Sequence, residues 1–386
     1  MFLNVQKYLV DHSLADLARD HGVYARWSTA NPSKFSLNYD QLEARDNDVI
    51  SQECRGLVLE CERVPVDGGV VGSTRILALP MHRFFNYGTG SAAPIILDQA
   101  RFYEKLDGTC CIFYWDRMLM RWCIATRSVP DADLPIDGYP DKTFSSLFWK
   151  AWKASGGDIS ALDYARGNQT FVFELCTPEN QIVVRYPDYR VYLLAVRNVH
   201  NGVEDMPDGW AKQIGLEVAP HYKLSSVGDM MRFVNDRNPS QHEGIVVCDD
   251  RFNRVKVKSA SYMAMSRIRD AAAKSPRAIL EVILSGKDDD VASMLPDYLV
   301  KVMDEQREQL KKLIHYMDDQ YKALYDADRK TFALHIQSAG MWMMGAHMAR
   351  YAGKCNSFHS WIMSQGKDGQ WSSTFLDGLL DMMKRL

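Results

Sequence analysis

Short runs of hydrophobic residues, separated by polar and turn-forming stretches, dominate the middle of the chain. The runs are rich in β-branched and aromatic residues, which favour strands over helices. The stretches between them contain the Gly, Pro, Asn and Asp residues that are typical of turns. This pattern predicts strands over residues 109–115, 122–127, 170–176, 190–196, 244–248 and 254–258.

Two other patterns flank this strand-rich stretch. The first hundred residues combine a predicted helix over residues 5–20 with short extended runs that predict strands over 54–60 and 75–79. After residue 261 the apolar residues fall at spacings of three and four, and Pro296-Asp297 suits a helix start. The apolar positions of this predicted helix are Leu299, Met303, Leu310, Leu313, Ile314, Met317, Tyr321 and Leu324.

These patterns divide the chain into three parts of an α+β protein. Residues 1–100 form a small α+β entry region, residues 101–262 a strand-rich core, and residues 263–386 a helical C-terminal domain. The length of 386 residues exceeds the roughly 100 to 200 residues of a typical single domain. The sequence shows no repeat, low-complexity tract or flexible linker, so we expect the parts to pack closely.

Composition and charge restrict the class of protein. Hydrophobic residues make up 46% and charged residues 25% of the chain, which excludes a disordered or fibrous protein. Because the net charge is -3, any contact with nucleic acid must come from a local basic patch. The eight cysteines show no C-x-x-C spacing, which favours reduced thiols in a cytoplasmic protein. No run approaches the length of a membrane span, so we expect no membrane partner.

The motif with the clearest chemistry is Lys105-Leu106-Asp107-Gly108, which directly precedes the predicted strand 109–115. A lysine beside a glycine at a turn can present its amine to a phosphorus atom without steric cover. By itself the pattern K-x-D-G also fits a surface turn with a solvated lysine. The interpretation therefore depends on the residues that follow.

Acids and lysines recur on the later predicted strands. Glu174 lies between apolar neighbours, where a carboxylate either faces solvent or serves a site. Glu243 directly precedes the strand 244–248, and Lys256 and Lys258 share one face of the next strand because side chains alternate. Two cations on one face suit a phosphate, although edge-strand lysines are also common as solvated residues.

The order Lys-x-Asp-Gly, strand acid, Glu-Gly and Lys-x-Lys resembles the covalent nucleotidyltransferase superfamily of DNA ligases, RNA ligases and capping enzymes. Within it the chain is most similar to the bacteriophage T4 RNA ligase 1 family. The supporting segments are Cys-Arg-Gly-Leu-Val at 54–58, Arg-Phe-Phe-Asn at 83–86 and Thr-Pro-Glu-Asn-Gln-Ile-Val at 177–183. The likeness covers residues 50–260. The tail that follows resembles the family only in being helical.

The resemblance implies a fold and a reaction. The fold is an adenylyltransferase core of antiparallel sheets with an α-helical C-terminal domain that helps to choose the RNA. Lys105 would attack the α-phosphorus of ATP and hold AMP, which would pass to a 5′-phosphate RNA end before a 3′-hydroxyl displaces it. Lys105 must first lose a proton, which we expect neighbouring cations and a hydrated metal ion to promote.

The resemblance also assigns roles to individual residues. Lys256 and Lys258 would neutralise charge that develops on the α-phosphate, and Asp107 would support the metal shell or the nucleophile. Glu243 would hold metal-bound water, and Glu174 would contact the ribose and the metal. An oxygen-rich, thiol-free set suits Mg²⁺, with Mn²⁺ as the alternative. The implied nucleotide contacts come from Arg55, Arg83, Phe85, Lys105, Leu106, Arg127, Glu174, Val246, Lys256 and Lys258.

Five positions invite other interpretations. Arg83 stands where a lysine is common in the family, and Gln181 stands where a basic residue is expected. His242 beside Glu243 suggests a metal-binding pair, but adjacent strand residues point to opposite faces, so we expect His242 to be incidental. A strand that faces the core on one side accounts for the adjacent Cys110 and Cys111 better than redox chemistry does.

Alternative functions remain open within and outside the superfamily. DNA ligases and capping enzymes carry a strand-rich OB domain after the last lysine motif, whereas helices are predicted here. A ligase-like RNA-end-binding protein would be marked by a lost nucleophile or acid, and neither is lost. The sequence holds no G-x-x-x-x-G-K-[ST] run, so a separate kinase and phosphatase would heal the ends. We therefore expect a monomeric RNA ligase acting on RNA ends, including tRNA, in the host cytoplasm if the chain comes from a bacteriophage.

Overall fold

The computed structural model describes residues 2–66, 68–286, 291–292, 295–326, 328–338, 344–367 and 370–386. The chain forms two compact units, Met1–Met263 and Ala264–Leu386. The first unit contains the sheets and the second is helical, so the predicted α+β fold with antiparallel sheets and a helical C-terminal region is confirmed. Short 3-10 helices are η1 (Leu97–Gln99), η2 (Ser160–Ala165) and η3 (Pro178–Asn180).

A four-stranded antiparallel sheet begins the first unit. Its order is β1-β2-β3-β4, and the predicted strands over 54–60 and 75–79 are confirmed within it. The predicted single helix over 5–20 is wrong, because the first helix ends at Leu9 and Ser13 caps a second one. The Ser13 hydroxyl accepts from the Asp16 amide, and the Asp16 carboxylate accepts from the Ser13 amide. The elements are α1 (Asn4–Leu9), α2 (Leu14–His21), β1 (Val23–Trp27), β2 (Lys34–Tyr39), α3 (Val49–Glu53), β3 (Arg55–Cys61) and β4 (Thr74–Ala78).

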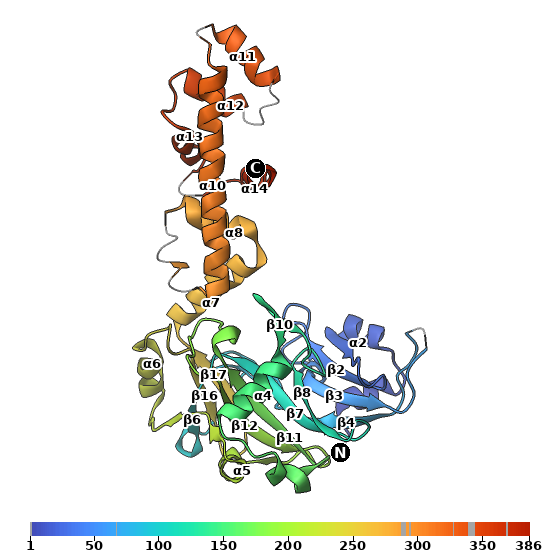
Figure 1. Cartoon of the computed structure of the whole chain (residues 1–386). Coiled ribbons are helices and arrows are strands. Elements are labelled where there is room, and N and C mark those ends of the chain that lie inside the picture. Colours follow the sequence, from blue (N-terminus) through green and yellow to red (C-terminus); the bar gives the residue numbers. More distant parts are fainter. Residues whose placement is uncertain are drawn as a thin grey trace. The chain divides into compact units, whose positions relative to one another are not determined.

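A six-stranded sheet follows, with α4 and α5 covering one of its faces (Figure 1). Its order is β13-β12-β11-β7-β8, and β14 pairs with β12 in parallel. Stacked and edge-on rings, among them Phe113, Phe148, Trp152 and Phe173, fill the space beneath α4. A separate two-stranded antiparallel sheet, β9 (Pro135–Ile136) and β10 (Tyr139–Thr143), lies between β8 and α4 along the chain. The other elements are β7 (Thr109–Asp116), β8 (Arg121–Thr126), α4 (Phe144–Ala154), β11 (Gln169–Cys176), β12 (Arg190–Asn198), β13 (Glu204–Asp205), α5 (Pro207–Ile214) and β14 (Glu217–Val218).

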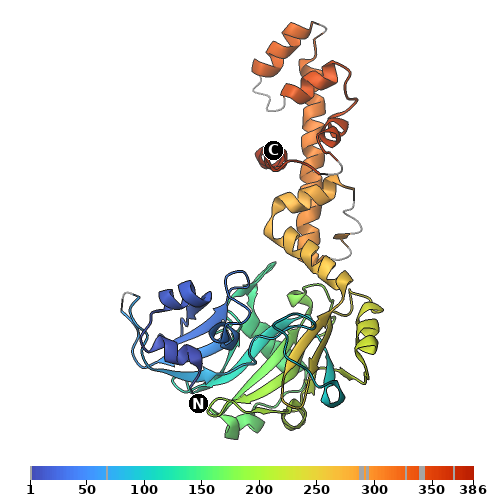
Figure 2. The same cartoon turned by 180° about the vertical axis from the view of Figure 1, so that it is seen from behind.

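A five-stranded sheet completes the first unit, and Figure 2 shows it with α6 on its outer side. Its order is β15-β6-β16-β17-β5, where β5 pairs with β17 in parallel. Phe102, Ile245, Val247 and Val255 form its core with Met230 of α6. All strands predicted between residues 109 and 258 are confirmed. The elements are β5 (Phe85–Asn86), β6 (Arg101–Glu104), β15 (His221–Tyr222), α6 (Val227–Asn235), β16 (Gly244–Cys248) and β17 (Arg254–Lys258).

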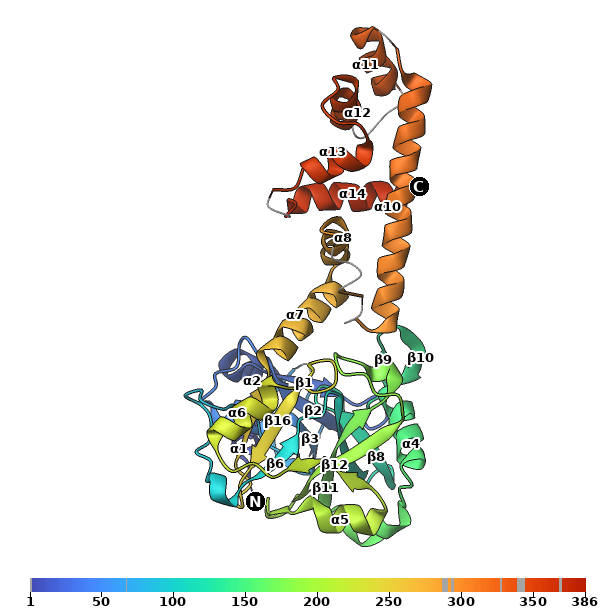
Figure 3. The same ribbon diagram turned by 90° about the vertical axis from the view of Figure 1, so that its left-hand side faces the viewer.

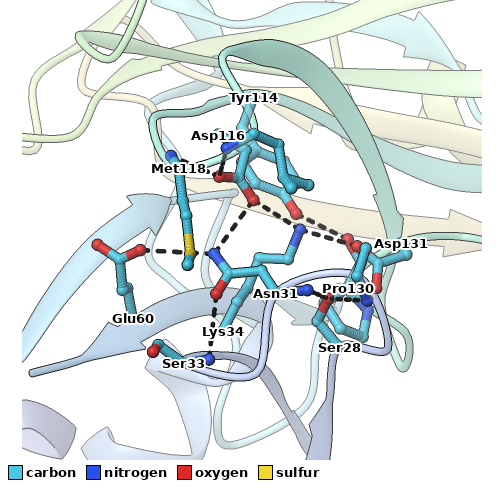
Figure 4. A network of polar contacts seen from close by, with 12 residues as sticks. Ser28, Asn31, Ser33, Lys34, Glu60, Tyr114, Asp116, Met118, Pro130 and Asp131 are labelled. Carbon is cyan, nitrogen blue, oxygen red and sulfur yellow. Dashed lines mark hydrogen bonds and ion pairs between the residues drawn. The ribbon is translucent and has the colours of Figure 1, made fainter. Parts of the chain in front are cut away.

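A buried group of polar residues ties β2 to the hairpin of β7 and β8 (Figure 4). The Lys34 side chain is fully buried, and its Nζ lies 2.8 Å from both Asp116 Oδ2 and Asp131 Oδ1. Asn31 approaches the same Asp116 oxygen, and the Tyr114 hydroxyl donates to the carbonyl of Pro130 at 2.7 Å. We call Lys34, Asp116 and Asp131 the Lys34 cluster.

The second unit is built around one long helix. Leu310, Leu313 and Met317 of α10 pack against α8, α13 and α14, which lie along it in Figure 3. The predicted start of this helix after Pro296 is confirmed. No helix within the described ranges is long and apolar enough to cross a membrane. The helices are α7 (Ala260–Lys274), which begins in the first unit, α8 (Pro276–Leu284), α10 (Asp297–Leu324), α11 (Arg329–Ser338), α12 (Met344–Tyr351), α13 (Phe358–Ser364) and α14 (Ser373–Arg385).

Candidate active site

The Lys105-Leu106-Asp107-Gly108 turn joins β6 of the five-stranded sheet to β7 of the six-stranded sheet. The Lys105 amide donates to the Gly244 carbonyl at 2.9 Å, and the Gly108 amide donates to Glu174 Oε1 at 3.1 Å. A Cβ atom on Gly108 would lie 2.2 Å from the Leu175 carbonyl oxygen, so any side chain would push the turn away from β11. The turn is therefore held between both sheets, unlike a solvated surface turn.

Lys105 and Lys258 share one buried carboxylate. Lys105 Nζ lies 2.6 Å from Glu243 Oε2, and Lys258 Nζ lies 2.7 Å from Glu243 Oε1. Burial lowers the pKa of Lys105, but the carboxylates of Glu243 and Glu174 offset this effect and hold the pKa above its ordinary value. The expectation that cations favour loss of its proton is therefore wrong for the nucleotide-free protein, because the nearest charges are carboxylates.

The surroundings of Lys256 shift its pKa in the opposite direction. Burial, followed by the charges of Lys105 and Lys258, lowers its pKa to about 8, and Arg55 and Arg127 act in the same direction. Two of these cations lie near the centroid of the Phe84 ring, Arg55 at 5.4 Å and Lys256 at 5.5 Å. Five of the six predicted cations, Lys105, Lys256, Lys258, Arg55 and Arg127, thus lie near one another, and Arg83 is not among them.

Glu174 lies on β11 opposite Cys110 of β7. Burial and the charge of Glu243 raise the Glu174 pKa to about 7, although Lys105 opposes the shift. Arg55 Nη1 approaches the Cys110 sulfur at 3.9 Å, so a thiol lies beside the predicted thiol-free set of metal ligands. Burial raises the pKa of Cys110, which keeps this thiol protonated and unsuited to bind a metal ion.

The oxygen donors fit a metal ion that is held partly by phosphates. Among the described residues, no group of three or more His, Cys, Asp and Glu side chains could hold a metal ion by itself. Mg²⁺ is commonly bound through one or two carboxylates together with water and substrate phosphates. Glu243 and Glu174, both close enough to influence the charge of Lys105, supply two such carboxylates.

Asp107 is engaged entirely by the protein. Its Oδ2 accepts from the Val183 and Val184 amides at 2.8 and 2.7 Å, and its Oδ1 accepts from the Tyr262 hydroxyl at 2.5 Å. The Tyr186 hydroxyl oxygen accepts a hydrogen bond from the Asp107 amide at 2.9 Å. Of the two roles expected for Asp107, these contacts favour support of the nucleophile turn over a place in a metal shell.

Tyr186 and Tyr262 were not predicted from the sequence. Buried tyrosines need a partner for the hydroxyl group, but the partner of Tyr262 lies 155 residues away along the chain. No spacing of neighbouring residues in the sequence predicts such a contact. Only the apolar character of both rings could have suggested that they are buried.

The remaining predicted nucleotide residues lie in different settings. The Arg83 guanidinium bonds Asp46 at 2.6 Å and stacks between the rings of Tyr39 and Phe85. Val246 and Phe85 flank the β17 residues around Lys256, since Val246 pairs with Lys256 and Phe85 pairs with Val255. The other two residues point into the protein: Leu106 packs with Cys176 and Ala219, and Gln181 is buried and donates to the Val183 carbonyl.

His242 and Glu243 point to opposite sides, as expected for neighbours at a strand. The His242 ring is not incidental, however, because its Nδ1 lies 2.9 Å from Glu104 Oε1. Cys111 is fully buried in the aromatic core, as expected for a core-facing strand residue. The site as a whole combines an amine, a surplus of cations and two carboxylates, which suits attack of nitrogen on a phosphorus atom.

Comparison with known proteins gives consistent similarities. A family model for RNA ligases of the T4 type 1 matches residues 53–262, just over half of the chain. An RNA ligase of Rhodothermus phage RM378 is 23% identical over 391 aligned positions, covering 86% of this chain and 82% of that protein. A putative bifunctional polynucleotide kinase/RNA ligase of Autographa californica nuclear polyhedrosis virus is 26% identical over 67% of this chain, which spans 37% of that protein's length.

Two solved RNA ligase structures show a distant likeness to this chain. A mutant Naegleria gruberi RNA ligase with ATP and Mn has a TM-score of 0.34 at 14% identity, covering 44% of this chain and 52% of that chain. An archaeal ATP-dependent RNA ligase has a TM-score of 0.45 at 13% identity, covering 84% of this chain and 86% of that chain. Both likenesses are loose in geometry and in sequence.

Proposed function

The chain belongs to the RNA ligase family of the T4 RNA ligase 1 type, and from that premise we propose that it is an ATP-dependent RNA ligase that holds AMP on Lys105. The observation that carries the proposal is the Lys105 amine on a fixed turn, with Glu243 shared between Lys105 and Lys258. Lys256, Arg55 and Arg127 add positive charge at the same place. Such a surplus of cations suits the triphosphate of a nucleotide.

The proposed first step is transfer of AMP to the enzyme. The deprotonated Lys105 Nζ attacks the α-phosphorus of ATP, a P–N bond forms, and the bond to the bridging oxygen breaks to release pyrophosphate. The protons that leave Nζ pass along its hydrogen bond to Glu243 and then to solvent. Lys256 and Lys258 neutralise the charge that develops on the phosphate oxygens.

Two further steps would join the RNA ends. A 5′-phosphate oxygen of RNA attacks the lysyl-AMP phosphorus, so that a P–O bond forms, the P–N bond breaks and Lys105 recovers its protons. The 3′-hydroxyl of the second end then attacks the 5′-phosphorus, which forms the phosphodiester, releases AMP and gives up the hydroxyl proton. A divalent ion, Mg²⁺ or Mn²⁺, would be held by Glu243 and Glu174 and would neutralise phosphate charge.

The substrates and setting are part of the same proposal. The helical residues 263–386 would select the RNA, with a broken tRNA as one candidate. A separate kinase and phosphatase would prepare the 5′-phosphate and 3′-hydroxyl ends. The protein would act as a monomer in a host cytoplasm, and the similar phage and baculovirus proteins support a viral setting.

Intact-protein mass spectrometry tests the proposal directly. Wild type and Lys105→Ala are incubated with Mg²⁺ and either ATP or GTP, after pyrophosphate treatment to remove any AMP already bound. A gain of one AMP in the wild type with ATP alone is the expected result. A protein that gains no nucleotide under either condition would instead be a ligase-like RNA-end-binding protein.

A further inference from the structure

The two segments that carry Lys105 and Glu243 are tied together on both sides of the sheet. On one side Lys105 Nζ contacts Glu243 at 2.6 Å. On the other side the preceding residue of each segment forms a second pair, with His242 Nδ1 2.9 Å from Glu104 Oε1. Between the pairs, the Lys105 amide donates to the Gly244 carbonyl at 2.9 Å.

The Glu104 carboxylate is buried and accepts from two donors. Only 8% of the residue is exposed, and its Oε2 accepts from the Tyr222 hydroxyl at 2.7 Å. On the far side of the histidine, Arg237 Nη1 lies 3.0 Å from His242 Nε2. Arginine can only donate, so Nε2 is the acceptor and the ring proton lies on Nδ1, which donates to Glu104. The orientation of the imidazole is therefore fixed by its two neighbours.

Arg237 is itself held by aromatic rings. Its guanidinium lies 3.9 Å from the Phe233 ring centroid and 5.0 Å from that of Tyr222. These two rings pack against the core beneath α6, on the face of the five-stranded sheet opposite Lys256. The Glu104–His242 pair thus belongs to the supporting side of the sheet and does not touch the cations of the candidate site.

We infer that Glu104 and His242 are positioning residues that hold the Lys105 amine against Glu243 for enzyme adenylylation. The inference rests on the proposed function. Rotation or loss of either side chain removes one of the ties between the end of β6 and the entry of β16, so that the amine shifts relative to the phosphate it must attack. A misplacement of about 1 Å can slow a reaction by about 100-fold, whereas nucleotide binding by residues on the other face should persist.

The test compares His242→Phe, which removes the hydrogen bond to Glu104, with His242→Asn, whose amide can donate from nearly the same position. Single-turnover formation of enzyme-AMP is measured over a range of ATP concentrations. We expect His242→Phe to lower the limiting rate by about 10- to 30-fold with half-saturation by ATP within about 2-fold. We expect His242→Asn to recover most of the rate.

Two controls separate positioning from a loss of structure. His21→Phe removes a matched pair, since His21 Nδ1 lies 3.0 Å from Asp48 Oδ2 in the same unit, and its adenylylation rate should stay at the wild-type value. Sealing of RNA that already carries a 5′-adenylate bypasses attack by Lys105. His242→Phe should therefore seal such RNA within about 3-fold of the wild-type rate.

The outcomes separate this inference from the proposed function. If the wild type forms no enzyme-AMP, the proposed function fails. If the wild type forms it and His242→Phe does so equally fast, only the positioning role fails. Equal slowing of His242→Phe, His242→Asn and His21→Phe, with parallel loss of sealing and of melting temperature, would also overturn the positioning role and leave a general structural one.

Discussion

Two lysines of this protein lie among carboxylates, but with opposite charge balance. Lys34 is fully buried between Asp116 and Asp131, at 2.8 Å from each. Lys105 keeps 21% of its side chain exposed and shares Glu243 with Lys258. Around Lys34 the carboxylates outnumber the lysine. Near Lys105 several cations lie together, and burial together with these cations lowers the pKa of Lys256 to about 8.

The difference separates a lysine that stabilises the fold from one that is available for chemistry. In the Lys34 cluster each charge is satisfied within the protein, and the side chain hydrogen bonds from Lys34 hold the pKa of Asp116 below its ordinary value even though burial opposes this. At Lys105 the surplus positive charge is satisfied only when a polyanion binds. A triphosphate would supply that charge.

The largest expected effect is on the reaction of Lys105→Ala. Enzyme-AMP formation should fall below detection, by at least about 10⁴-fold, because the attacking nitrogen is removed. Stability should change by less than about 1.5 kcal/mol, because Glu243 keeps Lys258 as a partner. Intact mass and urea unfolding measure the two effects, and an adduct on Lys105→Ala would remove the mechanism.

Lys34→Ala should lower the stability of the protein and leave its reaction rate unchanged. It leaves Asp116 and Asp131 buried without their cation, which costs about 3–5 kcal/mol when one partner of a buried pair is lost. The adenylylation rate per folded molecule should be unchanged. Urea unfolding checks the first expectation, and a second variant, Lys34→Met combined with Asp116→Asn, should recover part of the loss because it removes one of the stranded charges. A loss below about 1 kcal/mol in Lys34→Ala would contradict the comparison.

Lys256→Ala and Lys258→Ala should slow adenylylation by about 10²- to 10³-fold each, the range observed when one preorganised charge-stabilising group is removed. These effects should exceed that of His242→Phe, which acts through position alone. Rapid-quench measurement at saturating ATP ranks the three variants. Equal effects at all three positions would show that the pocket has been assigned to the wrong residues.

The smallest expected effect concerns pH and Lys256. Its pKa of about 8 means that the side chain is charged below pH 8 and loses its charge above it. The loss of a proton from Lys105, whose pKa lies above its ordinary value, favours high pH. The rate should therefore rise up to about pH 8 and then level off, because the loss of charge from Lys256 offsets further deprotonation of Lys105. Lys256→Arg keeps its charge at high pH, so from pH 8 to 9.5 its rate should rise about 3- to 10-fold more than that of the wild type. Parallel pH profiles would exclude Lys256 as the cause of the levelling.

Local patterns in the sequence predict the strands and the order of the motifs well. The strands at Gly244–Cys248 and Arg254–Lys258 have the predicted bounds, because alternation of side chains reports directly on each strand. The helix over 5–20 failed because one capping residue, Ser13, outweighed the apolar spacing around it.

Contacts between segments that are distant in the sequence cannot be predicted from such local patterns. The sequence places Glu243 before a strand but does not show that two lysines share it, so it does not predict which charges surround Lys105. Asp107 looked like a metal or nucleophile partner, although Tyr262 and the 183–184 amides occupy its oxygens. The periodicity of one strand reveals its own two faces but not which side chains from other segments meet them.

The hydrogen bond from Tyr262 to Asp107 fixes where this protein can be divided. Tyr262 lies on the first turn of α7, yet it belongs to the unit that ends at Met263. A gene fusion that joins a foreign tail directly after Lys258 would leave the Asp107 carboxylate buried without this donor. The helical tail can be exchanged between related proteins, in evolution or in the laboratory. Such an exchange should preserve the activity only when the junction lies after the first turn of α7.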